Sequence, residues 1–241
     1  MVPAEALRGT RWDPGFWLRA PASGGQPARL PTSPLGELIE KITYGPILTG
    51  QRPTPVPEGV AIIDQKAIRA TGVLLERATV VAEGCAYDLP RCRLRPGDIV
   101  LARSGAGTLA KKRFTVFHED AKATVSCFVD LIRLRGISPW YVVTYLRCRP
   151  GWSQVERLIN GVGTPNLSFD EVRSLAIPLL PHREQEEIDA AWSEIERLHR
   201  RGQRDDAERL LNGLAAQLER RLEADTLRTE KGTGTFCLKG P

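Results

Sequence analysis

The chain has 241 residues, of which 34 are Lys or Arg and 29 are Asp or Glu, and 41% are hydrophobic. This length allows one large domain or a domain with an appendage, and the composition is typical of a globular protein. There is no apolar run near the ~20 residues of a membrane span and no secretory signal in residues 1–20, so we expect a cytoplasmic protein without a membrane partner. The five cysteines form no CxxC pair, which favours free thiols over a disulfide framework or a metal site.

The positive charge is concentrated in the first three quarters of the chain. Residues 1–181 hold 23 basic and 16 acidic residues, whereas residues 182–241 hold 11 and 13. The densest basic stretch runs from Arg91 to Arg113, where seven cations accompany one acid, Asp98. Such a stretch can neutralise several phosphates, although a solvated basic face is an equally ordinary meaning of a run of this size.

The N-terminal half predicts loops followed by strands. Residues 1–34 are rich in Pro and Gly and predict an extended lead-in that packs by Trp12 and Trp17. Apolar residues at helical spacing predict a helix over 34–42, before a proline-rich loop that ends at residue 57. Strands are predicted over 59–63, 98–102, 114–117 and within 123–134. Together these elements favour an α/β (α+β) fold with a mixed sheet.

The next segments alternate between helix and strand. A helix is predicted over 138–146, with Pro150 and Gly151 stopping it, and a short helix over 153–159. Ser168 with Glu171 has the spacing of a capping box, and a strand is predicted over 175–180.

Residues 182–225 contain no proline and predict a long helical arm. The polar stretch around Gly202 leaves two possibilities open, a bend between two antiparallel helices or one continuous helix. We expect the arm to act as a dimerisation and spacer segment, although packing on its own domain is the ordinary alternative. Its expected interface consists of Ile188, Ile195, Leu198, Leu211, Leu214, Leu218 and Leu222. Residues 226–241 are expected to form a disordered tail.

One glycine-rich segment matches an enzyme motif. Gly105-Ala106-Gly107-Thr108-Leu109-Ala110 is a GxGxxA sequence directly after a predicted strand, as in dinucleotide or S-adenosylmethionine sites. Those sites need a helix next, whereas Phe114 begins a predicted strand, so a basic hairpin is favoured. The three histidines are too far apart in sequence to indicate a metal cluster, and we predict no catalytic residue and no cofactor.

Four segments in order resemble a known family. They are the opening Pro34–Ile39, the Pro-Gly-Asp-Ile-Val-Leu-Ala-Arg-Ser-Gly segment Pro96–Gly105, the Gly161–Ser168 segment ending in Asn-Leu-Ser, and the junction Ile177–Gln185. Over residues 10–200 the chain resembles the specificity (S) subunits of type I restriction-modification systems, in the half-length form with a single target-recognition domain. The junction departs from the family pattern by one extra residue before its second proline.

This resemblance implies a non-catalytic protein that reads duplex DNA. It would direct an adenine methyltransferase, and in a full complex a restriction translocase-nuclease, to a bipartite site, with residues 1–181 as the recognition domain. The alternative is an S-adenosylmethionine-dependent methyltransferase or nucleotide-binding enzyme built on Gly105-Ala106-Gly107. Candidate DNA-binding residues, chosen for their charge or for hydrogen-bonding groups in loops, are Tyr44, Gln51, Arg52, Arg91, Arg93, Arg103, Lys111, Lys112, Arg113, Asn160, Thr164 and Asn166. The sequence does not determine which bases are read, or whether the complex restricts or only methylates.

Overall fold

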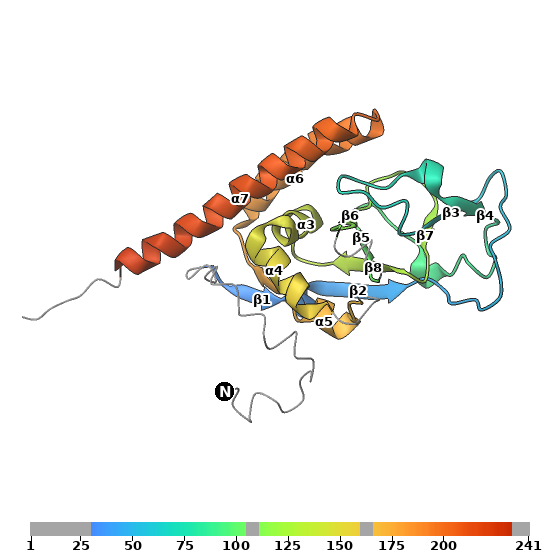
Figure 1. The fold of residues 1–241 in the computed structure, drawn as a ribbon, viewed down its shortest axis with the longest axis horizontal. Helices are drawn as coiled ribbons and strands as arrows, with labels where there is room; N and C mark the ends of the chain where they lie inside the picture. Colours follow the sequence, from blue (N-terminus) through green and yellow to red (C-terminus); the bar gives the residue numbers. More distant parts are fainter. Residues whose placement is uncertain (1–29, 105–110, 160–165, 233–241) are drawn as a thin grey trace, which may run out of the picture.

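A computed structural model describes residues 30–104, 111–159 and 166–232 (Figure 1). Its strands are β1 (Thr32–Pro34), β2 (Ile39–Tyr44), β3 (Val60–Ile63), β4 (Thr79–Val81), β5 (Ile99–Ala102), β6 (Phe114–Val116), β7 (Ala123–Val125), β8 (Val129–Leu134) and β9 (Ala176–Pro178). Its helices are α2 (Leu35–Leu38), α3 (Pro139–Arg147), α4 (Arg149–Leu158), α5 (Phe169–Arg173), α6 (His182–Arg200) and α7 (Arg204–Gly232), with 3-10 turns η2 (Leu75–Arg77) and η3 (Pro90–Cys92). These elements confirm the α+β prediction.

Three sheets organise the strands. The central sheet has four antiparallel strands in the order β2-β8-β5-β6. A second sheet, β4-β3-β7, pairs β3 with β4 antiparallel and with β7 parallel, so the mixed pairing lies there. The third sheet joins β1 to β9, which are near the start of the described chain and just before α6. Figure 1 shows the second sheet on the far side of the central sheet from α4 and α5.

The central sheet is buried on both faces because its strands alternate between two hydrophobic cores. Ile99 and Leu101 of β5 pack into the core shared with the helices. Val100 and Ala102 of the same strand pack into the core shared with β3 and β7. A strand that alternates in this way has apolar residues at every position, which explains the continuous Ile-Val-Leu-Ala run.

Several sequence-based boundaries need correction. The helix predicted over 34–42 ends at Leu38, and Ile39–Tyr44 instead form β2, which pairs with β8. Hydrogen bonding to a strand distant in sequence outweighs a local apolar spacing that fits a helix equally well. Pro150 occupies the first turn of α4 and does not stop the preceding helix, which ends at Arg147. The segment 123–134 is two strands, β7 and β8.

The helical arm is a hairpin of two helices and not one continuous helix. Gly202 has φ +77°, a conformation that suits glycine, and its amide donates to the carbonyl of His199 at 2.9 Å. Arg221 near the far end of α7 donates to Glu184 in the first turn of α6 at 3.1 Å, so the helices are antiparallel (Figure 1). The α7 helix continues to Gly232, beyond the expected boundary at residue 225.

The apolar stripes of the arm are buried inside the single chain. Trp192 of α6 is fully buried and donates from Nε1 to the Thr144 hydroxyl of α3 at 2.8 Å, and the Cys148 thiol donates to the Ala215 carbonyl of α7 at 3.1 Å. The predicted interface residues Ile188, Ile195, Leu211, Leu218 and Leu222 are buried, and Leu198 and Leu214 are partly buried against the same core. The arm therefore packs on its own domain, the ordinary alternative to an exposed interface, because the bend at Gly202 lets α6, α7 and α3 cover one another.

The lead-in with Trp12 and Trp17, the glycines 105 and 107, and residues 233–241 lie outside the described residues. The four described cysteines, Cys85, Cys92, Cys127 and Cys148, are free thiols. In the described part of the chain, no helix is long and apolar enough to cross a membrane.

Candidate nucleic-acid interface

Several of the predicted DNA-binding residues lie along one edge of the central sheet. The register places Tyr44 opposite Asp130, and Leu101 opposite both Asp130 and Phe114. The ends of β2 and β5 and the starts of β6 and β8 therefore lie side by side, and we call this the strand-end edge. Its side chains come from the residues at or just beyond these strand ends: Tyr44, Arg103, Lys112, Arg113 and Phe128.

Arg103 lies against two neighbouring aromatic rings. Its guanidinium carbon lies 4.5 Å from the centroid of the Tyr44 ring and 5.3 Å from that of Phe169, and the two rings are 5.6 Å apart. Cation–π contacts of this kind stabilise a guanidinium without neutralising it. The Arg103 Nε atom also lies 3.5 Å from Oδ1 of Asp130. The Arg103 side chain is 18% exposed, so part of it faces solvent at this edge.

Asp130 is an unusual partner for a cation because it is completely buried. Its side chain has no exposed surface, and neither carboxylate oxygen has a hydrogen-bond partner among the described residues. Burial raises the pKa of Asp130 to about 7, and the nearby Arg103 only partly opposes that shift. The carboxyl group thus orients Arg103 but does not form a strong bidentate ion pair with it.

Two of the segments that carry the family resemblance meet beside Arg103. Ser104 and Asn166 form an isolated antiparallel bridge, and the Leu167 amide donates to the Arg103 carbonyl at 3.0 Å. The following Ser168 caps α5 in a capping box with Glu171, as predicted. This pairing places the exposed Asn166 at the strand-end edge, next to a cation and two aromatic rings.

Gln65 is a residue that sequence reasoning missed at this edge. Its amide nitrogen donates to the Ser104 carbonyl at 2.8 Å and to the Phe128 carbonyl at 3.1 Å, and its own carbonyl accepts from Arg113 at 2.8 Å. The carbonyl that accepts from Arg113 is the main-chain one, so the side chain and backbone of Gln65 together join three strand ends that are far apart in sequence. Phe128, 58% exposed, is the most exposed aromatic side chain among the large hydrophobics of the described chain. An isolated glutamine after a strand has no sequence pattern that would indicate this role.

The basic residues before β6 extend the edge toward α7. Lys111 is exposed, and Lys112 has its ammonium 4.8 Å from the Trp152 ring centroid and 3.3 Å from the Arg147 carbonyl. Burial, and then the charge of Arg147, lowers the pKa of Lys112. Lys112 has φ +49° and is the single non-glycine residue with positive φ in the described part of the chain.

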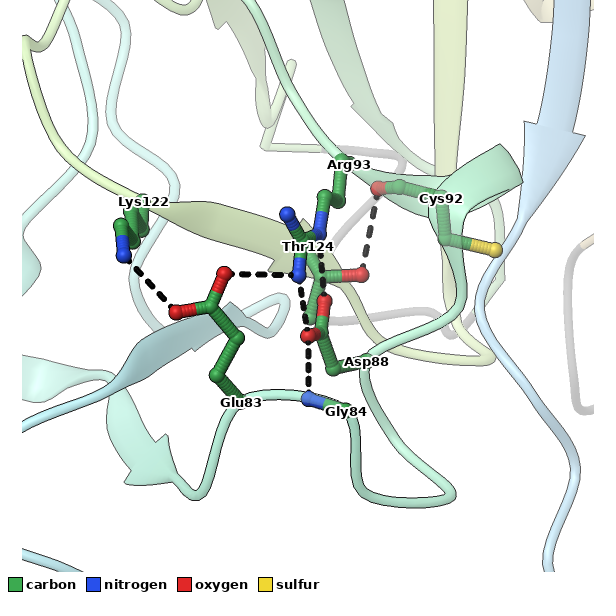
Figure 2. Close-up of polar contacts among 7 residues, drawn as sticks. All are labelled: Glu83, Gly84, Asp88, Cys92, Arg93, Lys122 and Thr124. Atoms are coloured by element: carbon green, nitrogen blue, oxygen red, sulfur yellow. Dashed lines mark hydrogen bonds and ion pairs between the residues drawn. The ribbon is translucent and has the colours of Figure 1, made fainter.

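Another candidate, Arg93, forms an isolated bridge with Thr124 of β7 and so lies beside the second sheet. Figure 2 shows Arg93 enclosed by acids: it donates to Asp88 at 2.9 and 2.6 Å and to Glu83 at 3.1 Å. The bond to Asp88 is the main reason that the pKa of Arg93 is raised, and the same arginine lowers the pKa of Asp88. Lys122 donates to the other oxygen of Glu83 at 2.7 Å. Arg93 is thus engaged within the fold, and we leave it out of the proposed interface.

Arg91, Gln51 and Arg52 are exposed. The Gln51 carbonyl accepts from the Tyr87 hydroxyl at 3.0 Å, which ties its loop to the second sheet. Asn160 and Thr164 lie outside the described residues. The part of the chain that the structure describes contains no group of three or more His, Cys, Asp or Glu side chains placed to hold a metal ion.

Comparison with known proteins gives structural relatives only. No protein-family model matches the chain, and no curated protein does. A chain of a structure concerning assembly and conformational transition of the type I R-M system matches with a TM-score of 0.52 and 16% identity, over 92% of this chain and 48% of that one. The HsdS subunit from Thermoanaerobacter tengcongensis matches with a TM-score of 0.48 and 17% identity, over 86% and 46%. The type I restriction-modification S subunit from M. genitalium matches with a TM-score of 0.45 and 13% identity, over 72% and 40%.

This chain therefore spans about half the length of the solved chains that it matches. At such low identity the likeness concerns the fold and not the residues of a site. Over the part that is matched, this chain has the fold of a chain from the structure of the type I R-M system.

Proposed function

We propose that the chain recognises a duplex DNA sequence through the strand-end edge. The observation that supports this most directly is the gathering of Arg103, Asn166, Tyr44 and the basic residues before β6 at the ends of neighbouring strands. Cations that approach phosphates and side chains that can contact base edges are the two components of sequence-specific DNA recognition. The likeness of fold to type I specificity subunits points in the same direction.

Some contacts would position the chain on the duplex, and others would read its sequence. Lys111 and Arg113 would contact phosphates, because they are cations at the edge that no carboxylate in the described chain pairs with. Arg103 and Asn166 would contact base edges, since a guanidinium can bind guanine and an amide can bind adenine through two hydrogen bonds. The aromatic rings and Asp130 hold the Arg103 guanidinium in place before DNA binds, which reduces the ordering cost of binding.

The proposal includes the partners expected from the fold. The chain would direct an adenine methyltransferase subunit, and in a full complex a translocase-nuclease subunit, to a bipartite target. One recognition unit would read one half of such a target. This chain covers 48% of the type I chain that it matches, so two copies would supply two recognition units. A pair of copies would have to associate through outer surfaces of the helical hairpin, because its inner faces are buried.

Selection of duplexes from a randomised pool, using the purified chain, tests the proposal. We expect one short sequence to be enriched by the wild-type protein. Arg103→Lys and Asn166→Ala should each relax the preference at particular positions, by roughly tenfold for a lost bidentate contact worth about 1–3 kcal/mol. Arg95→Gln, at the opposite edge of the sheet, is the matched control and should select the same sequence as wild type. Enrichment of no sequence, or an unchanged preference in both edge variants, would contradict the proposal.

The alternative of an enzyme built on Gly105-Ala106-Gly107 is not supported. Such sites need a helix after the glycine-rich loop, and the element that follows is β6, which pairs antiparallel with β5. The β5 and β6 strands form a hairpin, as the sequence favoured.

A further inference from the structure

A cavity of about 380 Å³ opens between the start of β6 and the first half of α7. Its volume is within the range of small-ligand sites. The globular part and α7 both contribute to its wall, with Asn212 on the α7 side. Its charged lining residues are Arg69, Lys111, Lys112, Arg113, Arg147 and Glu208.

The positive charges in this cavity are not neutralised by the fold. Arg147 donates to the carbonyls of Phe114, Lys112 and Ala70 at 2.5, 3.2 and 3.3 Å, and its buried Nε atom has no partner. Arg69 likewise donates to two backbone carbonyls, at 2.8 and 2.9 Å. Across residues 30–104, 111–159 and 166–232, none of the five cations forms an ion pair with a carboxylate. Partial dipoles of carbonyl groups offset a buried cation less well than an anion does.

The cations also repel one another. Burial, followed by the charges of Arg77, Arg113 and Arg204, lowers the pKa of Arg69. Burial alone lowers the pKa of Arg147 to about 10, and the charge of Glu208 partly opposes both shifts. Lys112 adopts its positive φ in this wall, a conformation that is strained for a residue with a Cβ atom. Strain and like-charge repulsion at one place are typical of a site that is completed by a ligand.

We propose that this cavity, the α7 pocket, binds a phosphate group. The proposal rests on the proposed function in one respect, that the phosphate belongs to the backbone of the duplex bound along the strand-end edge. The pocket adjoins that edge because Lys112 and Arg113 belong to both. A phosphate there would accept hydrogen bonds from the guanidinium groups and from the Asn212 amide of α7. Glu208 would oppose its binding, so α7 both contacts the phosphate and limits its affinity.

Duplex binding by four variants tests the pocket. Glu208→Gln removes the opposing charge at an exposed position, so the fold should be unaffected and affinity should rise about threefold to tenfold at low salt. Its matched control is Glu58→Gln, which changes the net charge equally at an exposed position in the loop before β3. Arg69→Gln with Lys111→Gln should weaken binding at least tenfold and reduce the log-log salt slope by about 1–2. Arg95→Gln with Arg135→Gln, exposed at the opposite edge, is the control for that loss.

The outcomes separate this proposal from the proposed function. If wild type binds duplex DNA and the pocket variants behave like their controls, the pocket is not a phosphate site although the DNA-binding function stands. If wild type binds no duplex, inorganic phosphate and pyrophosphate are tested by thermal shift. A saturable rise in melting temperature that is lost in Arg69→Gln with Lys111→Gln assigns the pocket to free phosphate, and no rise overturns it. Binding of an acidic peptide that phosphate does not displace would assign the pocket to a protein partner and also overturn it.

Discussion

Two buried aspartates of the central sheet lie near opposite ends of β5 and differ in their partners. Asp98 accepts two hydrogen bonds of 2.7 Å from Arg133 and one of 2.8 Å from the Arg95 amide, so its charge is fully satisfied. Asp130 has a single cation at 3.5 Å and no hydrogen bond among the described residues. The aspartate of the Pro-Gly-Asp-Ile-Val segment is thus a structural residue of the fold, while Asp130 is the one whose charge is costly.

We predict that Asp130 makes the stability of the protein depend on pH. Its pKa rises from 3.8 to about 7 on folding, so between these values the folded state binds a proton that the unfolded state has lost. Stability from this group is therefore present below pH 4 and is lost as pH rises through 7, by at most about 4 kcal/mol at 1.36 kcal/mol per unit. Asp130→Asn cannot titrate. Its free energy of unfolding relative to wild type should increase between pH 4.5 and pH 8.

Denaturant unfolding of wild type and Asp130→Asn across this pH range measures the difference between their free energies of unfolding. The contributions of the other titrating groups cancel in that difference. Asp64→Asn is a suitable control, since Asp64 caps a loop by accepting from the Lys66 and Ala67 amides at 2.7 and 3.0 Å and is only partly buried. A wild-type to Asp130→Asn difference that stays constant with pH would show that Asp130 is ionised throughout and is paired more strongly with Arg103 than the geometry indicates.

At the scale of elements, the parts of the fold that depend on neighbouring residues were predictable. The Ser168 and Glu171 capping box and the strand Ile99–Ala102 follow from a spacing and from an apolar run after a turn. The segment 39–44 was predicted wrongly because its partner, β8, lies about ninety residues away, and nothing local distinguishes a helix face from a strand there. Long-range pairing decides such segments.

The candidate site was predictable as a set of residue types but not as an arrangement. Tyr44, Arg103 and Asn166 were chosen separately for their hydrogen-bonding groups or charge, and strand register brings them together. Phe169 and Gln65 complete the edge by ring contact and by backbone hydrogen bonds, which have no signature in a single sequence. In the sequence, Arg93 is a cation like Arg91 and Arg95. Its ion pair with Asp88, which removes it from the candidate site, depends on how the chain folds.

The tip of the helical hairpin is attached to the globular part by a histidine pair. His199 of α6 donates from Nε2 to the Val73 carbonyl at 3.1 Å, so its Nδ1 accepts from the Thr71 hydroxyl at 2.9 Å. His118 packs edge-on against it with ring centroids 5.7 Å apart. A Cβ atom on Gly72 would lie 2.6 Å from Nε2 of His118, so only glycine fits between the rings.

We predict that acid weakens this attachment. Burial lowers the pKa of His199 below 6.5, so the folded state holds it neutral while the unfolded state gains a proton as pH falls. The stability from this group is present above pH 6.5 and is lost below it. His118 and Arg204 disfavour the protonated form further, whereas Glu119 favours it. Hydrogen exchange of the Thr71–Val73 amides and of the last turn of α6 should accelerate between pH 7.5 and pH 5.5, after correction for intrinsic rates.

His199→Gln should exchange faster than wild type at both pH values and should lose the extra acceleration in acid, since glutamine does not titrate. His182→Gln changes the exposed histidine at the opposite end of α6 and should respond to pH as wild type does. An acid response that persists in His199→Gln would place the sensitive group elsewhere in the junction, on His118 or Glu119.

At the scale of the whole molecule, the helical hairpin packs on the globular part and is not a free arm. The α7 helix contacts α6 and α3 along its inner face, where Ala207, Leu211, Leu218 and Leu222 are buried. Arg149 at the start of α4 pairs with Glu219 and Glu223 of α7, at 3.3 and 2.7 Å. A substitution on this inner face would therefore disturb the fold before it could reveal any assembly.

Two adjacent leucines of α7 separate folding from assembly. Leu211 is 1% exposed and Leu210 is 45% exposed, because consecutive residues of a helix face different directions. Leu211→Glu would bury a carboxylate among apolar side chains and should destabilise the chain by at least about 3 kcal/mol. Leu210→Glu should change the free energy of unfolding by no more than about 0.5 kcal/mol. Denaturant unfolding of the two variants measures both effects, and equal destabilisation would mean that α7 is rotated from the orientation described.

Sedimentation of the folded Leu210→Glu variant then tests how two copies associate. If a dimer of the proposed kind forms through the outer surface of α7 around a two-fold axis, the new glutamates of the two copies approach each other, and their repulsion should shift the dimer toward monomer. Wild type should sediment as a dimer under the same conditions, and Arg135→Glu, on the far edge of the central sheet, should leave it so. A wild-type protein that is monomeric at tens of micromolar would exclude self-association through the hairpin, and a bipartite target would then need a different second reader.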